Sequence, residues 1–211
     1  MLSRALNVDP VQPLDLTHSL LRDVQGFWLP LPSTAGGSRL YDIARQGVHG
    51  DINGAVWARL AESSFPALAY DGDDYVDTGV GSIGETGLFT DPGEEFTVIV
   101  EARVGVNETG TLVGRAASSA NSRTFQLFFN QNIQSSHNPG VNLRGNGNFG
   151  TDAGLNDGQI HRHYLTWDGS DAFYFADGGA KSTSIPVGTS SENTDQNIIF
   201  GARTNGTGFF L

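Results

Sequence analysis

The segment DGQIHRHYLTWDGSDAFYFADG, residues 157–178, contains two alternating strand patterns joined by a tight turn. Its first half, QIHRHYLTW, is rich in aromatic and β-branched side chains, which favour strands. The dipeptide Asp168-Gly169 is typical of a hairpin turn, and a second pair, Asp177-Gly178, follows the returning strand AFYFA. The segment therefore predicts a β-hairpin within an antiparallel sheet.

Strand patterns continue on both sides of this hairpin. The clearest is EEFTVIVEARV, residues 94–104, where Phe96, Val98 and Val100 fall on one face and Thr97 and Ile99 on the other. Strict alternation predicts one buried face and one face that meets water. Further strands are predicted in GFWLPLP, PALAYDGDDYVDTG (two short ones), TLVGR, TFQLFFN, GVNLR, NIIFGAR and TGFFL.

The joints between these strands are rich in glycine, asparagine and serine. The 28 glycines suit turns that need a positive φ, and no helix of normal length with an apolar stripe is predicted. From residue 24 onward the sequence thus predicts an all-β fold, a two-sheet antiparallel jelly-roll sandwich.

Composition narrows the classes of partner. The 211 residues fit one domain with an extension. A net charge of −11, from 23 acidic against 12 basic residues, argues against a nucleic-acid partner, because phosphate contacts need clustered lysine and arginine. No apolar run approaches the roughly 20 residues that span a bilayer, so no membrane partner is expected. The absence of cysteine removes disulfides, zinc–thiolate sites and cysteine nucleophiles.

Residues 1–23 form a separate segment, punctuated by Pro10 and Pro13. They lack the continuous apolar core of a secretory signal, yet they carry too many apolar residues for a free linker. We interpret residues 1–23 as an N-terminal arm that docks on a partner or on the sandwich of residues 24–211. The apolar residues of the arm are Leu2, Leu6, Val8, Val11, Leu14, Leu16, Leu20 and Leu21.

Several motifs in order resemble the laminin-G-like jelly roll of the concanavalin A-like lectin/glucanase superfamily. They are LYDIARQGVHGDINGAVW, which ends in a Trp, then LAYDGDDYVDTG, EFTVIVEARV, TLVGR, the hairpin and NIIFGARTNGTGFFL. The resemblance covers about residues 24–211 and includes domains of the kind found in phage virion proteins. The resemblance implies a further strand after the last motif, so we expect either that the sandwich of residues 24–211 lacks its last strand or that a partner supplies it.

Catalytic and cofactor motifs are weak. Related glucanases carry Glu-x-Asp-x-x-Glu on one strand, whereas here Glu101 is followed by Ala102 and Arg103. Two GxGxxG matches, residues 79–84 and 145–150, are not followed by a helical pattern and are interpreted as turns. The sequence therefore leads us to expect no catalytic residues, no enzyme activity and no organic cofactor.

Two histidines share a face of the hairpin's first strand. His161 and His163 lead to Leu165 and Trp167, so a partly buried, hydrogen-bonded row is favoured over a metal site. A calcium site is the alternative cofactor prediction, at a turn crowded with carboxylates. Its candidate ligands are Asp71, Asp73, Asp74 and Asp77.

A sugar site is the remaining binding prediction, because sugar sites combine aromatic faces with amide and guanidinium groups. The candidates are Tyr174, His137, Asn138, Asn142, Arg144, Asn146 and Phe149. Aromatic residues of β-proteins are more often in the core, which is the competing interpretation.

Together these features predict a structural or interaction protein of a virion surface, made in the host cytoplasm, as a decoration, cement or tail-associated protein. Its expected partners are other virion proteins and copies of itself. The alternatives are an extracellular carbohydrate-binding adhesion module and, third, a glycoside hydrolase.

Overall fold

The computed structural model describes residues 24–30, 37–44, 47–59, 66–80, 95–105, 108–116, 123–130, 138–143, 149–150, 155–179, 184–185 and 197–201. Within these ranges every regular element is a β-strand, and all the strand pairs are antiparallel. The predicted all-β, antiparallel class is therefore confirmed. The predicted arm of residues 1–23 and the predicted strand TGFFL lie outside the described residues.

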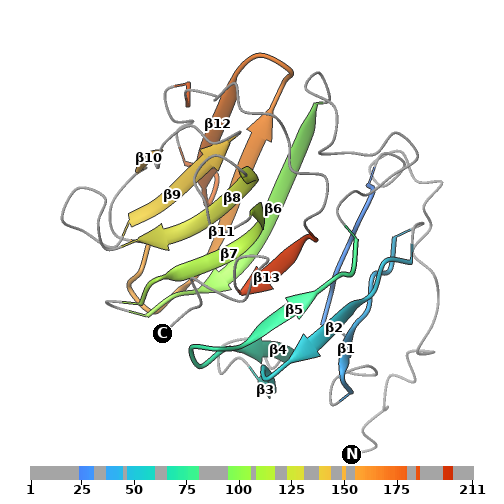
Figure 1. Ribbon diagram of the computed structural model, residues 1–211. Coiled ribbons are helices and arrows are strands. Elements are labelled where there is room, and N and C mark those ends of the chain that lie inside the picture. Colours follow the sequence, from blue (N-terminus) through green and yellow to red (C-terminus); the bar gives the residue numbers. More distant parts are fainter. Residues whose placement is uncertain are drawn as a thin grey trace, which may run out of the picture.

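The strands form three sheets (Figure 1). The largest contains, in spatial order, β1 (Arg39–Leu40), β2 (Gly50–Asn53), β5 (Tyr75–Asp77), β13 (Ile199–Gly201), β7 (Gly110–Ala116), β8 (Arg123–Asn130), β9 (Asn138–Leu143) and β10 (Phe149–Gly150). The second contains β12 (Ala172–Ala176), β11 (Ile160–Trp167) and β6 (Phe96–Arg103). The smallest pairs β3 (Val56–Arg59) with β4 (Pro66–Ala69). No described helix is long and apolar enough to span a membrane.

The predicted hairpin is β11 followed by β12. Five residue pairs join the two strands, and the N–H of Asp168 donates to the carbonyl of Asp171 at 3.1 Å to close the turn. Gly169 has φ 88° in this turn. The second predicted turn is also present, with φ 51° at Asp177 and 72° at Gly178. A positive φ at these positions is the reason that the Asp-Gly pairs marked the turns.

Alternation along β6 and β11 puts the predicted faces inside. Residues of β6 alternate between partly buried and exposed along the whole strand, as its sequence predicted. On β11, His163 and Leu165 are fully buried and Trp167 is 8% exposed. The predicted partly buried row is therefore confirmed.

One hydrophobic core joins the two larger sheets. Leu165 and Trp167 of β11 share it with Phe125, Leu127 and Phe129 of β8. The rings of Phe96 and Phe125 meet across the two layers with centroids 6.0 Å apart. Figure 1 shows β7 to β9 overlapping β11 and β12 as two layers. The outer face of the β12–β11–β6 sheet consequently points away from this core.

In the described part of the first predicted strand, GFWLP, the strand pairing is a single bridge between Trp28 and Asp42. The reason is the buried Asp42 carboxylate, whose Oδ1 atom accepts the N–H of Phe27 at 2.8 Å and whose Oδ2 atom accepts the N–H of Val48 at 3.0 Å. The indole N–H of Trp28 donates to the carbonyl of Val48 at 2.7 Å. Side-chain bonds thus replace the expected ladder between strands.

Gly201 lies where no side chain fits. Its φ is 84°, and a Cβ atom there would stand 2.5 and 2.6 Å from two ring carbons of Tyr70. Gly201→Ala is expected to lower the free energy of unfolding by about 2–3 kcal/mol, from left-handed strain and overpacking together. Gly178→Ala is the matched control, because Gly178 has φ 72° and open space around it. If denaturant titrations show the same loss of unfolding free energy in the two variants, a clash between the new Cβ atom and Tyr70 is contradicted.

Candidate functional site

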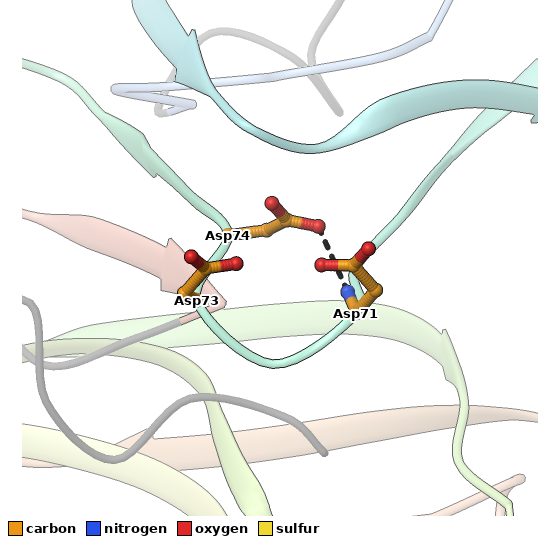
Figure 2. A group of neighbouring side chains, drawn as sticks. All are labelled: Asp71, Asp73 and Asp74. Atoms are coloured by element: carbon orange, nitrogen blue, oxygen red, sulfur yellow. Dashed lines mark hydrogen bonds between the residues drawn. The ribbon is translucent and has the colours of Figure 1, made fainter.

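Three of the four predicted calcium ligands come together in the loop between β4 and β5. The carboxylates of Asp71, Asp73 and Asp74 offer oxygens that all lie within 4.8 Å of one another (Figure 2). Asp71 and Asp73 are exposed, whereas Asp74 is buried. Hard carboxylate oxygens are the ligands that calcium prefers, with water and backbone carbonyls completing a coordination number of about six to eight. The donor set therefore suits a calcium ion at the loop surface.

Asp74 is fixed by close packing on several sides. Its Oδ2 atom accepts the N–H of Asp71 at 2.8 Å. Gly54, with φ 80°, approaches so closely that a Cβ atom there would stand 1.9 Å from Asp74 Oδ1. Burial raises the pKa of the nearby Tyr70 hydroxyl, and the negative charge of Asp74 raises it further. The loop thus holds one carboxylate rigidly and presents two to solvent.

The fourth predicted ligand, Asp77, is not part of this group. Its Oδ1 atom accepts the side-chain N–H of Asn197 at 2.9 Å and the N–H of Gly79 at 2.8 Å. Asp77 lies within β5, three residues beyond Asp74, where the strand has left the loop. The predicted set of four is corrected to three for this geometric reason.

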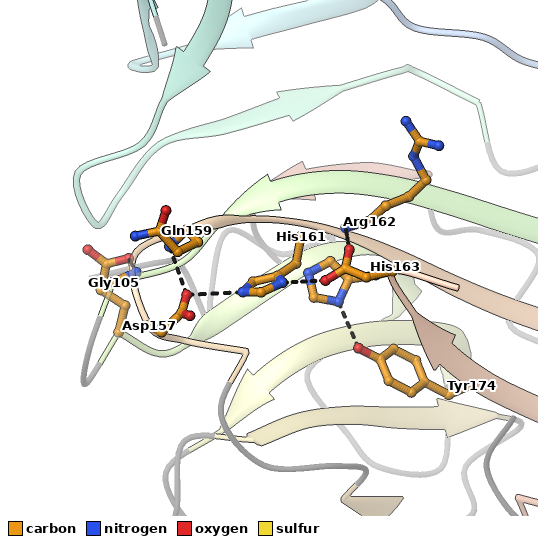
Figure 3. Close-up of polar contacts among 9 residues, drawn as sticks. Gly105, Asp157, Gln159, His161, Arg162, His163 and Tyr174 are labelled. Carbon is orange, nitrogen blue, oxygen red and sulfur yellow. Dashed lines mark hydrogen bonds and ion pairs between the residues drawn. The ribbon is translucent and has the colours of Figure 1, made fainter. Parts of the chain in front are cut away.

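A second polar cluster closes the open end of the β11–β12 hairpin. The imidazole of His161 lies between two carboxylates, with Nδ1 2.6 Å from Asp177 Oδ2 and Nε2 3.0 Å from Asp157 Oδ1 (Figure 3). The N–H of Arg162 donates to the other oxygen of Asp177 at 2.8 Å, and the N–H of Gln159 donates to Asp157 at 2.8 Å. We call Asp157, His161 and Asp177 the histidine clamp.

The clamp favours the charged form of every member. Burial opposes protonation of His161, but hydrogen bonds to Asp177 and Asp157 outweigh it and raise the pKa of the imidazole. The N–H of Gln159 and the bond from His161 lower the pKa of Asp157. The N–H of Arg162 and the bond from His161 lower the pKa of Asp177. The clamp is thus an imidazole held between two carboxylates, whose hydrogen bonds and charges favour its protonated form.

The clamp predicts a loss of stability at alkaline pH. A raised folded-state pKa for His161 contributes stability that is complete below its unfolded pKa of about 6.5 and is lost as the pH rises through the folded value. His161→Gln is expected to flatten this alkaline limb in urea titrations between about pH 6 and 9. The prediction is wrong if the wild-type protein and His161→Gln show the same slope over this range.

His163, two residues further along β11, is fully buried. Its Nδ1 atom and the hydroxyl of Tyr174 share a hydrogen bond of 2.7 Å, and its ring stands edge-on to Phe129 with centroids 5.5 Å apart. Burial, with the nearby charge of His161, lowers the pKa of His163 to about 4. The pKa values of the two histidines are therefore shifted in opposite directions, and their contacts confirm the hydrogen-bonded interpretation of the row.

The predicted sugar-binding residues are not found together at the described surface. Tyr174 is 2% exposed and belongs to the core, and Asn142 is fully buried on β9. Neither presents a group to an external ligand, because strand alternation turns Tyr174 inward and both sites are covered. The side chains of Asn138 and Phe149, together with His137, Arg144 and Asn146, lie outside the described residues.

Sequence reasoning found His161 but missed its carboxylate partners. Asp157 lies four residues before His161, and Asp177 lies one residue beyond the end of β12. Pairing the residues of the hairpin outward from the Asp168-Gly169 turn would have placed Asp177 opposite Arg162, next to His161. The hairpin register was therefore the available signal.

The outer face of the β12–β11–β6 sheet carries an apolar row. Ile99, Tyr164 and Phe175 are direct cross-strand neighbours. The rings of Tyr164 and Phe175 stack with centroids 4.5 Å apart and planes 8° from parallel. Ile99 is 56% exposed. Beside this row lies the exposed ion pair of Arg162 and Glu101, so an apolar strip with a charged rim faces solvent.

Comparisons with known proteins bear on the fold. A scan against protein-family models and a search of curated proteins both find no match. Among solved structures, a Trypanosoma rangeli sialidase in complex with sialic acid matches 88% of this chain and 28% of its own, with 15% identity and a TM-score of 0.54. A mutant of that sialidase displaying trans-sialidase activity matches 86% of this chain and 31% of its own, with 14% identity and a TM-score of 0.53.

These likenesses correct the expectation that the chain is not an enzyme, because both of these structural neighbours are enzymes. The chain spans less than a third of each sialidase, and at such identity the likeness concerns the fold alone. The expectation rested on the absence of the paired carboxylates of glucanases, and that absence bears on one class of mechanism only.

Proposed function

We propose that this chain is an interaction protein of a virion surface, built on a laminin-G-like jelly roll that attaches to a larger assembly. The apolar row of Ile99, Tyr164 and Phe175 carries the proposal. Scattered apolar residues are ordinary on protein surfaces, but a contiguous apolar strip with a polar rim is typical of a protein-binding site. The motif order that resembles phage domains supports the virion setting.

The shape of the row suits a protein partner better than a sugar chain. Tyr164 and Phe175 stack on each other at 4.5 Å, so each ring covers one face of its neighbour. Rings in this arrangement do not form the flat platform that a pyranose face needs. The Arg162–Glu101 pair at the rim offers charges that orient a docking protein.

The test is binding to particles of the virus that encodes the chain, stripped of peripheral proteins. The wild-type protein is expected to cosediment with these particles, and Tyr164→Lys is expected to weaken binding at least tenfold, since it puts a charge into an apolar contact. Val56→Lys is the matched control, because Val56 is 61% exposed on a different sheet. Equal binding by the two lysine variants would refute the role of the row, and no binding by wild type would refute the proposal.

Calcium at the loop of Asp71, Asp73 and Asp74 is part of the same proposal. Loop sites of this openness bind calcium with dissociation constants of about 0.1–1 mM, so 10 mM calcium is expected to stabilise the fold by about 1.4–2.7 kcal/mol. That corresponds to a rise in melting temperature of about 3–11 °C. Asp73→Asn is expected to remove most of the rise and Asp77→Asn to retain it. No heat in calorimetry and no rise in wild type would contradict the site.

An extracellular glycan-binding module is the second candidate. The specific observation in its favour is that one of the structural neighbours was solved with sialic acid bound. A glycan array and saturation-transfer NMR with sialic acid would detect binding. A fluorogenic sialoside and reducing-sugar assays on laminarin-like polymers would detect turnover, the third possibility. Glycan binding without particle binding would favour this candidate over the first.

A further inference from the structure

Strand β6 is an edge strand of its sheet in the part of the chain that the structure describes. Among the described strands it pairs with β11 alone, through eight consecutive residue pairs without a bulge. It contains no proline or glycine. The other described edges of the two larger sheets are short or partly covered: β1 and β10 have two residues each, and β12 is bridged from Ala172 to Ile185. Long edges without a bulge are templates for another strand.

The exposed face of β6, extended by the residue before the strand, carries opposite charges at its two ends. It reads Glu95, Thr97, Ile99, Glu101 and Arg103, and all five are exposed. Ile99 is at the centre, with an acid four residues before it and a base four residues after it. A second copy running antiparallel, with Ile99 on the two-fold axis, brings each Glu95 opposite the partner's Arg103.

We infer that two copies of this chain join β6 to β6 across a two-fold axis centred on Ile99, making one continuous six-stranded sheet. This register also pairs Thr97 with the partner's Glu101, whose carboxylate can accept a hydrogen bond from the Thr97 hydroxyl. On the inner face it pairs Val98 with the partner's Val100. The inference rests on the proposed assembly function and names the surface through which copies of the chain meet.

Neighbouring registers are less favourable. Side chains must share a face across the pair, so alternative axes lie one residue away along the strand. An axis at Val98 puts Glu95 opposite the partner's Glu101, which is repulsive. An axis at Val100 puts the apolar Ile99 opposite the partner's Glu101 and leaves Arg103 opposite the partner's Thr97. Charge therefore selects the axis at Ile99.

Cysteine cross-linking of the purified full chain tests the inference, because the native sequence has no cysteine. Ile99→Cys places each thiol opposite its own copy, at a cross-strand Cα separation of about 4.5–5.5 Å, which a disulfide can bridge. Thr97→Cys is the matched control on the same strand and face. Its copies stand four residues apart along the pair, about 13 Å, which is too far. With diamide at micromolar protein, the first variant is expected to form covalent dimer and the second is not.

Charge reversal gives an independent measurement. Glu95→Arg and Arg103→Glu are each expected to raise the dimer dissociation constant about tenfold at low salt, since each creates two like-charged contacts. The double variant is expected to restore wild-type affinity, and Arg39→Glu on β1 is the charge control. A wild-type monomer at 100 μM, no cross-link at position 99, or no rescue by the double variant would each overturn the inference. Particle binding is measured separately with Tyr164→Lys on the central strand, so the two proposals fail independently.

Discussion

Phe125→Ala is expected to lower the free energy of unfolding by about 3–5 kcal/mol. Phe125 is fully buried on β8 and meets Phe96 of β6 across the two layers, with ring centroids 6.0 Å apart. Alanine leaves a cavity between the sheets, and their hydrogen-bonded ladders prevent the strands from closing it. Urea titration followed by tryptophan fluorescence measures the loss, since Trp167 lies in the same core.

Val56→Ala is the control for this experiment. Val56 is 61% exposed on β3, so its truncation is expected to change stability by less than about 0.5 kcal/mol. Phe125→Leu keeps most of the volume and is expected to lose less than Phe125→Ala. A loss below about 1 kcal/mol for Phe125→Ala would mean that the two sheets do not share the core described.

Acidification from pH 6.5 to 4 is expected to cost about 3 kcal/mol of stability through His163 alone. The pKa of His163 is about 4 in the folded protein, against about 6.5 in an unfolded chain. Between these values the unfolded state binds a proton that the buried imidazole does not, so stability falls as the pH falls. The loss begins below about pH 6.5 and levels off near the folded pKa.

His163→Gln is expected to remove most of this acid limb, because glutamine does not titrate and can still bond to the Tyr174 hydroxyl. His161→Gln is expected to keep the acid limb and to lose the alkaline one. Urea titrations of the three proteins from pH 4 to 9 separate the two histidines. If His163→Gln loses as much stability between pH 6.5 and 4 as the wild-type protein, the loss belongs to another titrating group.

Local pattern predicted the strands well. The strict alternation of β6 and the Asp-Gly turns of the β11–β12 hairpin agree with the structure because pleat and turn φ are decided within a few residues. The pattern failed at GFWLPLP, where a distant carboxylate, Asp42, takes the backbone N–H of Phe27 out of the ladder. Side-chain capture of this kind leaves no periodic signal.

The candidate sites were predicted less completely. Clustering of aspartates in one loop located Asp71, Asp73 and Asp74, since residues so close in sequence cannot separate far in space. The histidine clamp depends on Asp157 and Asp177, which are twenty residues apart and meet only because the hairpin returns. Tyr174, predicted for a sugar site, is in the core because its strand turns that face inward.

The sequence by itself determined the all-β class, the hairpin and the faces of its strands, because alternation and turn chemistry act between near neighbours. Only the tertiary structure decided which of the described sheet edges has no strand paired to it, which aromatic residues lie on the outer face as the apolar row, and in which direction the pKa of each histidine is shifted. Those properties depend on what packs against a residue from far along the chain. Burial and neighbouring charge set the opposite pKa shifts of His161 and His163, although the two residues are two positions apart on one strand.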